Sequence, residues 1–294
     1  MQKTFAFIRS QLQGLYPEPE IKSFSYLILE FICKKDRQNI WLGKDKQLSS
    51  NEWLQIKEIV TELKKYRPIQ YIIGETEFYG IKLKVDANVL IPRPETEELV
   101  EWIINDFSPT ARRVKEVELE EEKELNILDI GTGSGCIAVS LAKHLTSASV
   151  YALDISEEAL GVARQNAEKN GVDVQFFRHD IFEEWPDYLP QRWSIIVSNP
   201  PYVTPEEKTI MSKNILDYEP HQALFVPQEK PLLFYERIAS MALTCLKANG
   251  NLYFETSSIY GKDVVAMLKS KGFRTVELKQ DISGRDRMVR ILMR

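Results

Sequence analysis

Apolar residues recur at helical spacing throughout the first part of the chain. Three stretches place them on one helical face, and the sequence Ser50-Asn51-Glu52 before the third is typical of a capped helix start. Arg67-Pro68 ends the pattern, because the residue before a proline is disfavoured in a helix. The three stretches are Phe5/Ile8/Leu12/Leu15, Tyr26/Leu27/Phe31 and Trp53/Leu54/Ile56/Ile59/Val60/Leu63. The pattern predicts a small helical bundle over residues 1–68.

Residues 69–91 have strand character instead. Gly74 and Gly80 permit turns between short apolar segments, so we expect a β-hairpin that links the bundle to the rest of the chain. The apolar segments are Tyr71-Ile72-Ile73, Phe78-Tyr79-Gly80 and the alternating Ile81/Leu83/Val85.

The remainder, residues 92–294, alternates between strand and helix patterns. Prolines stiffen Ile91-Pro92-Arg93-Pro94, and Thr96 with Glu97 or Glu98 indicates a helix start. Strands are expected at 126–130, 150–155, 174–178, 194–198, 251–255, 273–278 and 288–293, and helices at 136–145, 157–169, 232–246 and 260–270, with a long loop at 201–230. Such alternation predicts an α/β fold, a doubly wound sheet with helices on both faces.

Composition and charge narrow the possible functions. The chain has 294 residues, of which 44% are hydrophobic and 28% charged, and its formal net charge is −5. This balance disfavours general nucleic-acid binding, which needs a basic face, and better suits a basic protein partner. The charged run at 112–124 is expected to be a solvated loop or helix extension, with contact to a basic partner as the alternative.

Cysteine and histidine usage gives no sign of redox or metal chemistry. The three cysteines are far apart without CxxC spacing, the three histidines lack metal-ligand spacing, and no apolar h-region follows Met1. We therefore expect a cytoplasmic protein with no metal and no membrane segment, and a monomer. These residues are Cys33, Cys136 and Cys245, and His144, His179 and His221.

A glycine-rich loop follows the strand that ends in Leu128-Asp129-Ile130. Gly131, Thr132, Gly133, Ser134 and Gly135 would let the backbone approach a ligand and leave free N–H groups at a helix start. A tight strand-to-helix turn without a ligand is the alternative. The glycines alternate and do not meet the G-x-G-x-x-G spacing, which weakens a nicotinamide interpretation.

Two aspartates follow at the ends of the next strands. Asp154 stands about 20 residues after the glycines, where an acidic group accepts hydrogen bonds from ribose hydroxyls. Asp180 ends the third strand and would accept a hydrogen bond from an adenine amino group. Either aspartate alone could be a helix cap or a turn residue. Together they outline a nucleoside site.

The segment Asn199-Pro200-Pro201-Tyr202 follows the buried strand 194–198. Neither proline can donate a strand hydrogen bond, so the chain must leave the sheet there in a rigid turn. The turn holds an amide side chain, two carbonyls and an aromatic ring where ligands bind in open α/β sheets. A substrate amino group could donate to these acceptors under the ring. A proline-rich surface turn is the alternative.

The ordered motifs together resemble the HemK/PrmC family of class I methyltransferases, which modify peptide chain release factors. The resemblance covers nearly the whole chain. It is carried by 68–74, Glu77-Phe78-Tyr79-Gly80, Leu90-Ile91-Pro92-Arg93-Pro94-Glu95-Thr96-Glu97, the glycine loop, Asn199 to Tyr202, Glu219-Pro220-His221-Gln222-Ala223-Leu224 and Gly284-Arg285-Asp286-Arg287. Asn-Pro-Pro-Tyr alone is shared with several amino methyltransferases.

The resemblance implies a class I methyltransferase (Rossmann-like) fold and S-adenosylmethionine as methyl donor, with S-adenosylhomocysteine as product. Gly131 to Gly135 and Asp154 would hold it, with Asp180 and Ile181 beside the adenine and Asn199 next to it. The family often has Trp where Ile181 stands, and Glu-Ile-Gly where this chain has Glu255-Thr256-Ser257-Ser258. That second segment is expected to lie away from the transfer chemistry.

The implied reaction is methyl transfer to the side-chain N5 of the glutamine in a Gly-Gly-Gln motif, a protein methylation that serves translation termination. Asn199 and Pro200 would accept the two amide hydrogens, Pro201 would line the substrate site, and Tyr202 would pack over the amide. The bundle 1–68 would dock the release factor. An amino methyltransferase acting on DNA or RNA bases, a silent binding protein and a small-molecule methyltransferase are the alternatives.

Overall fold

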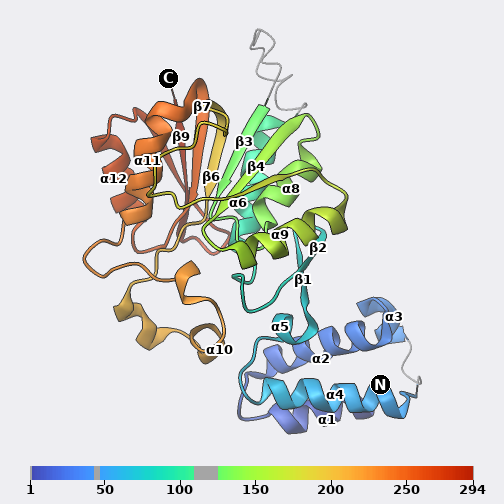
Figure 1. Cartoon of the computed structure of the whole chain (residues 1–294). Helices are drawn as coiled ribbons and strands as arrows, with labels where there is room; N and C mark the ends of the chain where they lie inside the picture. The colour runs from blue at the N-terminus through green and yellow to red at the C-terminus, as the bar shows by residue number, and fades with distance from the viewer. Residues whose placement is uncertain (1, 43–46, 109–124, 294) are drawn as a thin grey trace. The chain divides into compact units, whose positions relative to one another are not determined.

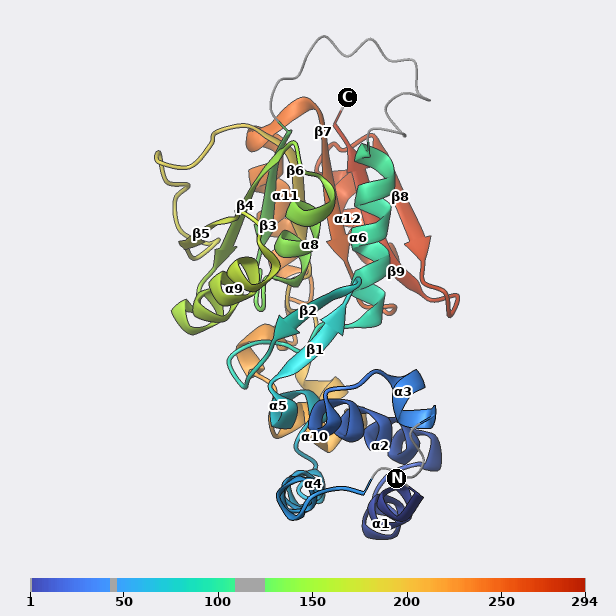
Figure 2. The ribbon, with the colours of Figure 1, turned by 90° about the vertical axis from the view of Figure 1, so that its right-hand side faces the viewer.

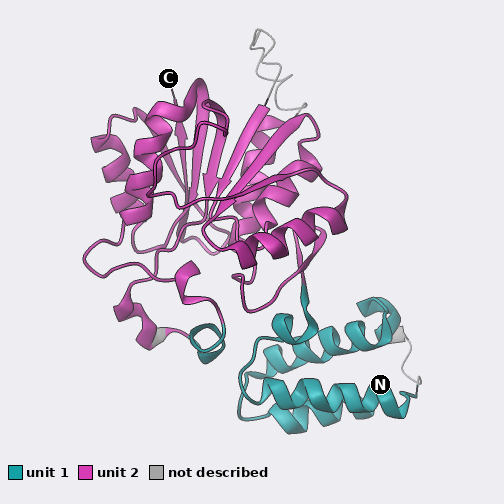
Figure 3. Cartoon of the chain, in the orientation of Figure 1, with its two compact units in different colours: residues 1–75, 212–218 teal, residues 76–211, 219–294 magenta. Residues whose placement is uncertain are grey.

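The computed structural model describes residues 2–42, 47–108 and 125–293, so the charged run at 112–124 lies outside the described residues. The chain forms two compact units (Figure 3). Unit 1 comprises Met1–Glu75 and Ser212–Tyr218, and unit 2 comprises Thr76–Met211 and Glu219–Arg294. The short segment Ser212–Tyr218 belongs to unit 1 although it is distant in sequence, which the residue pattern did not indicate.

Unit 1 is the predicted helical bundle. Its core is apolar and includes Ile8, Leu12, Ile28, Ile56 and Leu63. A capping box begins the fourth helix: the Ser49 hydroxyl accepts from the Glu52 amide and Glu52 accepts from the Ser49 amide, one position earlier than expected. The helices are α1 (Gln2–Leu12), α2 (Glu18–Cys33), α3 (Arg37–Leu42), α4 (Ser50–Leu63), α5 (Ile69–Ile73) and α10 (Lys213–Leu216).

The strand expected at Tyr71-Ile72-Ile73 is wrong, because these residues belong to helix α5. Pro68 precedes the helix, Gly74 ends it in the left-handed conformation, and burial of Ile69 and Tyr71 stabilises it. Because the segment has only five residues, their preference for a strand is weaker than the stabilisation that this packing gives to the helix.

The predicted hairpin is confirmed over strands β1 (Glu75–Phe78) and β2 (Ile81–Lys84). Its two-residue turn, Tyr79-Gly80, has positive φ at both positions (45° and 73°), as tight hairpin turns require. The Tyr79 amide donates to Glu97 Oε1 at 2.9 Å. That contact anchors the turn to helix α6 (Pro94–Phe107).

Unit 2 is built on one sheet with the strand order β5-β4-β3-β6-β7-β9-β8 (Figures 1 and 2). All neighbouring pairs are parallel except those of β9, which runs antiparallel to β7 and β8. The strands are β3 (Leu125–Ile130), β4 (Ala148–Asp154), β5 (Gln175–Arg178), β6 (Trp193–Ser198), β7 (Leu246–Glu255), β8 (Thr275–Gln280) and β9 (Asp286–Leu292). The predicted strands are therefore present, but their pattern did not reveal the reversed strand.

Helices cover both faces of this sheet, as the doubly wound prediction requires (Figure 2). Alternate strand residues point to opposite faces. Thus Ile127 and Ile195 pack with helices α6, α8 (Cys136–His144) and α9 (Glu157–Asn170), whereas Leu128 and Ile196 pack with α11 (Leu233–Cys245) and α12 (Gly261–Ser270). Because β3 to β7 are parallel, their carboxyl ends share one edge of the sheet.

Candidate functional site

A cavity of about 470 Å³ lies at the carboxyl edge of the sheet, entirely within unit 2. The segments that follow β3, β4, β5 and β6 all line it, together with residues from α11 and two loops. The lining residues are Ala87 to Leu90, Ile130, Gly131, Gly133, Leu153 to Ser156, Ala159, His179 to Phe182, Ser198 to Pro201, Pro220, Gln222, Ala223, Phe234 and Ile238. The cavity thus brings together the glycine loop, both aspartates and most of Asn199-Pro200-Pro201-Tyr202.

The glycine loop is held against β4 by its own backbone. The amides of Gly131 and Thr132 both donate to the Leu153 carbonyl at 2.9 Å, and the Gly133 amide donates to Asp154 Oδ2 at 2.8 Å. The Ser156 amide donates to Asp154 Oδ1 at 3.0 Å. Asp154 is therefore oriented by two backbone donors, with acceptor capacity left for a ligand.

The glycines of the loop serve different purposes. Gly131 and Gly133 line the cavity with φ of 72° and 54°, conformations that a side chain would strain. Gly135 does not line it; a Cβ there would lie 3.1 Å from the Ala163 Cβ, so this glycine lets α8 approach α9. Thr132 and Ser134 are also absent from the lining and are buried behind it.

A fully buried carboxyl group, Asp129, supports the same loop. Its Oδ2 accepts from the Thr132 hydroxyl at 2.7 Å and from the Ala138 amide at 3.2 Å. Its Oδ1 has no hydrogen-bond partner among the described residues. Burial raises the pKa of Asp129 to about 7. The sequence pattern assigned this residue no role beyond the strand.

An aromatic pair borders the cavity beside Asp180. Asp180 Oδ1 accepts from the Phe182 amide at 2.9 Å, and the Phe182 ring meets Phe234 edge-on with centroids 5.3 Å apart. Ile181 lines the cavity but is mostly buried in the core, whereas Phe182 is 44% exposed. The family resemblance indicated only Ile181 at this position. Phe182, the next residue, supplies an aromatic face that no motif indicated.

Asn199 begins a hydrogen-bond chain that leads from the cavity into the core. Its Nδ2 donates to Thr96 Oγ1 at 3.3 Å, and the Thr96 hydroxyl donates to Glu255 Oε2 at 2.6 Å. The Tyr202 hydroxyl donates to Glu255 Oε1 at 3.4 Å. Tyr202 is not among the residues that line the cavity. Burial raises the pKa of Glu255 and that of Tyr202.

Two expectations are corrected by this chain. Thr96 does not start helix α6, which begins at Pro94 after Arg93; it is buried in the first turn and bonds to Glu255. Glu255 was expected to lie away from the residues assigned to the transfer, yet it contacts both Thr96 and Tyr202. No spacing in the sequence connects these positions.

An ion pair between a buried carboxylate and a partly exposed arginine joins two segments that border the cavity. Glu219 Oε1 accepts from Arg93 at 2.6 Å, and Glu219 Oε2 accepts from the Ile91 amide at 3.3 Å. Burial raises the pKa of Glu219, while Arg93 opposes that shift. The pair fixes the loop ahead of α6 against the loop at Pro220, and so shapes the cavity wall.

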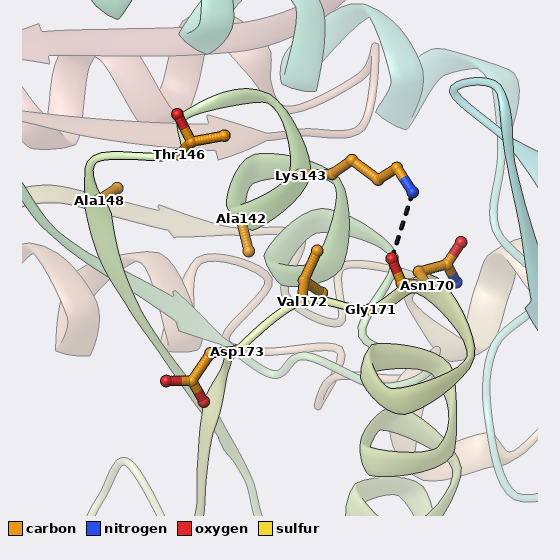
Figure 4. Close-up of a pocket in the computed structure, with 8 residues that line it drawn as sticks. All are labelled: Ala142, Lys143, Thr146, Ala148, Asn170, Gly171, Val172 and Asp173. Atoms are coloured by element: carbon orange, nitrogen blue, oxygen red, sulfur yellow. Dashed lines mark hydrogen bonds between the residues drawn. The ribbon is translucent and has the colours of Figure 1, made fainter.

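A second depression, of about 330 Å³, lies at the opposite, amino-terminal end of β4 (Figure 4). It is lined by Ala142, Lys143, Thr146, Ala148 and 170–173. Lys143 Nζ donates a hydrogen bond to the Asn170 carbonyl oxygen at 3.2 Å. None of the residues that the sequence singled out lies there, so the cavity at the carboxyl edge is the candidate site.

No group of three or more His, Cys, Asp or Glu among the described residues is placed to hold a metal ion. None of the helices in the described ranges is both long and apolar enough to cross a bilayer.

Comparisons with known proteins agree with this architecture. The family model of the PrmC N-terminal domain matches residues 4–74, and that of the methyltransferase small domain matches 114–221. A release factor glutamine methyltransferase of Flavobacterium psychrophilum is 46% identical over 283 residues, with 96% of this chain and 95% of the relative covered. A protein of the same name from Bacteroides thetaiotaomicron is 46% identical over 289 residues, covering 98% and 99%.

A solved structure, the hMettl16 catalytic domain in complex with a 3′UTR hairpin, is similar with a TM-score of 0.55 and 15% identity. The match covers 83% of this chain and 80% of that one, and it bears on the fold alone.

The fold and its cavity define a class I methyltransferase, the class whose methyl donor is S-adenosylmethionine. Two relatives that are 46% identical to this chain, and that match it over almost the whole length of both proteins, identify the family within this class. The chain belongs to the release factor glutamine methyltransferase family.

Proposed function

We propose that this protein transfers a methyl group from S-adenosylmethionine to the side-chain N5 of the glutamine in the Gly-Gly-Gln motif of peptide chain release factors. The names of the relatives support this substrate. The observation that carries the proposal is the orientation of Asn199 at the cavity. Its amide NH₂ group is engaged by Thr96, which leaves Oδ1 as an acceptor for an incoming amide.

The cavity fits S-adenosylmethionine in its donor set. Asp154 would accept from the ribose hydroxyls with the oxygen lone pairs that Gly133 and Ser156 leave free, and Asp180 would accept from the adenine amino group. Ile181 would flank the adenine together with Phe182. Gly131 and Gly133 would bring the backbone close, while Thr132, Ser134 and Gly135 would support the loop from behind.

On the substrate side, the residues of the turn would orient a weak nucleophile. An amide nitrogen is a weak nucleophile because its lone pair is delocalised, so the reaction rate depends strongly on how the nitrogen is oriented toward the methyl group. Asn199 Oδ1 and the Pro200 carbonyl would accept its two hydrogens and stabilise the positive charge that develops on nitrogen. Bound S-adenosylmethionine supplies the electrophilic methyl group. The nitrogen loses its proton after transfer, so no general base is required.

Pro201 lines the cavity and would form part of the substrate wall. Tyr202 is proposed to cover the amide plane. Its hydroxyl is tied to Glu255, which limits where the ring can lie. A structure with a bound glutamine peptide would test this position directly.

The proposed domain roles follow the sequence boundaries. Residues 1–68 would dock the release factor, 69–91 would form the linker with the hairpin, and 92–294 would carry the chemistry. The protein is proposed to act in the cytoplasm as a monomer.

Labelled S-adenosylmethionine and purified release factor test the function. Label should appear on the intact factor and be absent from a factor whose Gly-Gly-Gln glutamine is replaced. Asn199→Ala should abolish labelling, while Asn105→Ala, at an exposed position on α6, should not change it. Labelling of RNA or DNA in place of the factor would contradict the proposal.

A further inference from the structure

The chain of hydrogen bonds behind Asn199 joins three elements that are distant in sequence. Asn199 follows β6, Thr96 lies in the first turn of α6, and Glu255 ends β7. Thr96 is 2% and Glu255 1% exposed. Only Asn199 of the three lines the cavity, so Thr96 would influence a substrate through Asn199, and Glu255 through Thr96 or through its contact with Tyr202.

The direction of this chain follows from the chemistry of its last member. The hydrogen bond from Thr96 and the charge of Arg287 favour the ionised form of Glu255 against the effect of burial, and an ionised carboxylate can only accept hydrogen bonds. Thr96 must therefore donate its proton to Glu255, and the Thr96 oxygen is left to accept from Asn199. A primary amide could otherwise present either its oxygen or its NH₂ group to the cavity. Here the NH₂ group is drawn toward Thr96 and the oxygen remains for the ligand.

Glu255 also holds the far end of the same turn. Its Oε1 accepts from the Tyr202 hydroxyl at 3.4 Å, and its backbone carbonyl accepts from the Tyr235 hydroxyl at 3.1 Å. The carboxyl group thus accepts from Tyr202, the last residue of Asn199-Pro200-Pro201-Tyr202, and from Thr96, which accepts from the first residue. Burial of a carboxyl group costs free energy unless the group is hydrogen-bonded, and these partners supply hydrogen bonds to Glu255.

We propose that Thr96 and Glu255 are positioning residues for methyl transfer, which set the orientation of the Asn199 amide so that its oxygen faces the substrate. This inference rests on the proposed function in that it assigns Asn199 to the substrate amide. It adds two residues that touch neither cofactor nor substrate.

Thr96→Val and Thr96→Ser separate positioning from mere stabilisation. Valine has nearly the shape of threonine but no hydroxyl, whereas serine keeps the hydroxyl. Tyr253→Phe is the matched control, because it removes another buried hydroxyl that donates to a carboxylate, Asp106 Oδ2 at 2.7 Å, from the same strand β7.

With release factor as substrate, Thr96→Val should lower kcat by about 10- to 100-fold, the effect of a misplaced reacting group. The Kd of S-adenosylmethionine should change by less than about threefold, because Asn199 is oriented and not removed. Thr96→Ser should restore kcat, and Glu255→Gln should lower it, since a glutamine side chain can donate toward Thr96. A kcat for Thr96→Val equal to that of Tyr253→Phe would overturn the proposal.

A second readout does not depend on the substrate. The side-chain amide signals of Asn199 in proton–nitrogen correlation spectra, assigned with Asn199→Ala, should move in Thr96→Val and return in Thr96→Ser. Unchanged signals in Thr96→Val would overturn the positioning role even with an active enzyme. If wild type labels no release factor while these signals respond as expected, the proposed function fails and the positioning of Asn199 stands.

Discussion

The two halves of the cavity are held together in different ways. On the cofactor half, which the glycine loop, Asp154 and Asp180 would form, Gly133 donates to Asp154, which is 21 positions away. On the substrate half, which Asn199 to Tyr202 would form, Asn199 depends on Thr96, 103 positions away, and Thr96 depends on Glu255, 159 positions from it. A local βα motif therefore builds the first half, and the packing of the whole unit builds the second.

The sharpest test of this comparison is Asn199→Ala. Loss of the Asn199 side-chain acceptor should lower kcat by about 100- to 1,000-fold, as for other groups that stabilise developing charge. The Kd of S-adenosylmethionine, measured by titration calorimetry, should change far less. An equal loss in both quantities would mean that the halves are not separate.

Asp154→Ala makes the reciprocal change on the cofactor half. Hydrogen bonds to a charged group contribute about 1.5–3 kcal/mol, so the Kd of S-adenosylmethionine should rise by roughly 10- to 100-fold. At saturating cofactor, kcat should stay close to that of wild type. Asp173→Ala, at the amino-terminal depression, is the control and should leave both constants unchanged.

Asp129 gives a pH test of the cofactor half. Burial raises its pKa from 3.8 to about 7, so the folded protein keeps a proton that the unfolded chain releases. The contribution of Asp129 to stability should be complete below about pH 4 and be lost as pH rises to 7, by at most about 1.4 kcal/mol per pH unit. Urea unfolding of wild type and Asp129→Asn between pH 4 and 7 checks this. If the free energy of unfolding changed equally with pH in the two proteins, the raised pKa of Asp129 would be contradicted.

Phe182→Ala should give the smallest effect. An aromatic contact contributes about 0.5–1.5 kcal/mol beyond its buried area, so the Kd of S-adenosylmethionine should rise by roughly 2- to 10-fold. Tyr188→Ala, another exposed aromatic position that does not line the cavity, is the control. No change in Kd for Phe182→Ala would leave Ile181 as the apolar neighbour of the adenine.

Most of the fold was predictable because its signals are local. The strands and helices of unit 2 appear where apolar runs, glycines and caps indicated them, and the hairpin turn at Tyr79-Gly80 was expected. The error at Tyr71-Ile72-Ile73 arose because a short apolar segment reads alike as strand or helix, and burial against the bundle decided between them. The reversed strand β9 carries no pattern that distinguishes it from a parallel one.

The candidate site likewise contains residues that local signals predicted and residues whose role depends on packing. Gly131, Gly133, Asp154, Asp180 and Asn199 were identified from their places at strand ends, and the structure brings them to one cavity. Thr96 looked like a helix cap and Glu255 like a strand end remote from the site. Their importance depends on α6 and β7 meeting behind Asn199, a meeting that no short motif records.

The sequence by itself determined the family, the α/β architecture and which glycines, aspartates and amide stand at the strand ends, because each depends on periodicity or on a motif within a few positions. Tertiary structure alone decided which side of the Asn199 amide faces outward, which aromatic ring borders the cavity beside Asp180, and which carboxyl groups are buried. The first depends on contacts between elements more than 100 positions apart, and all three depend on packing, which sets hydrogen-bond partners and solvent exclusion.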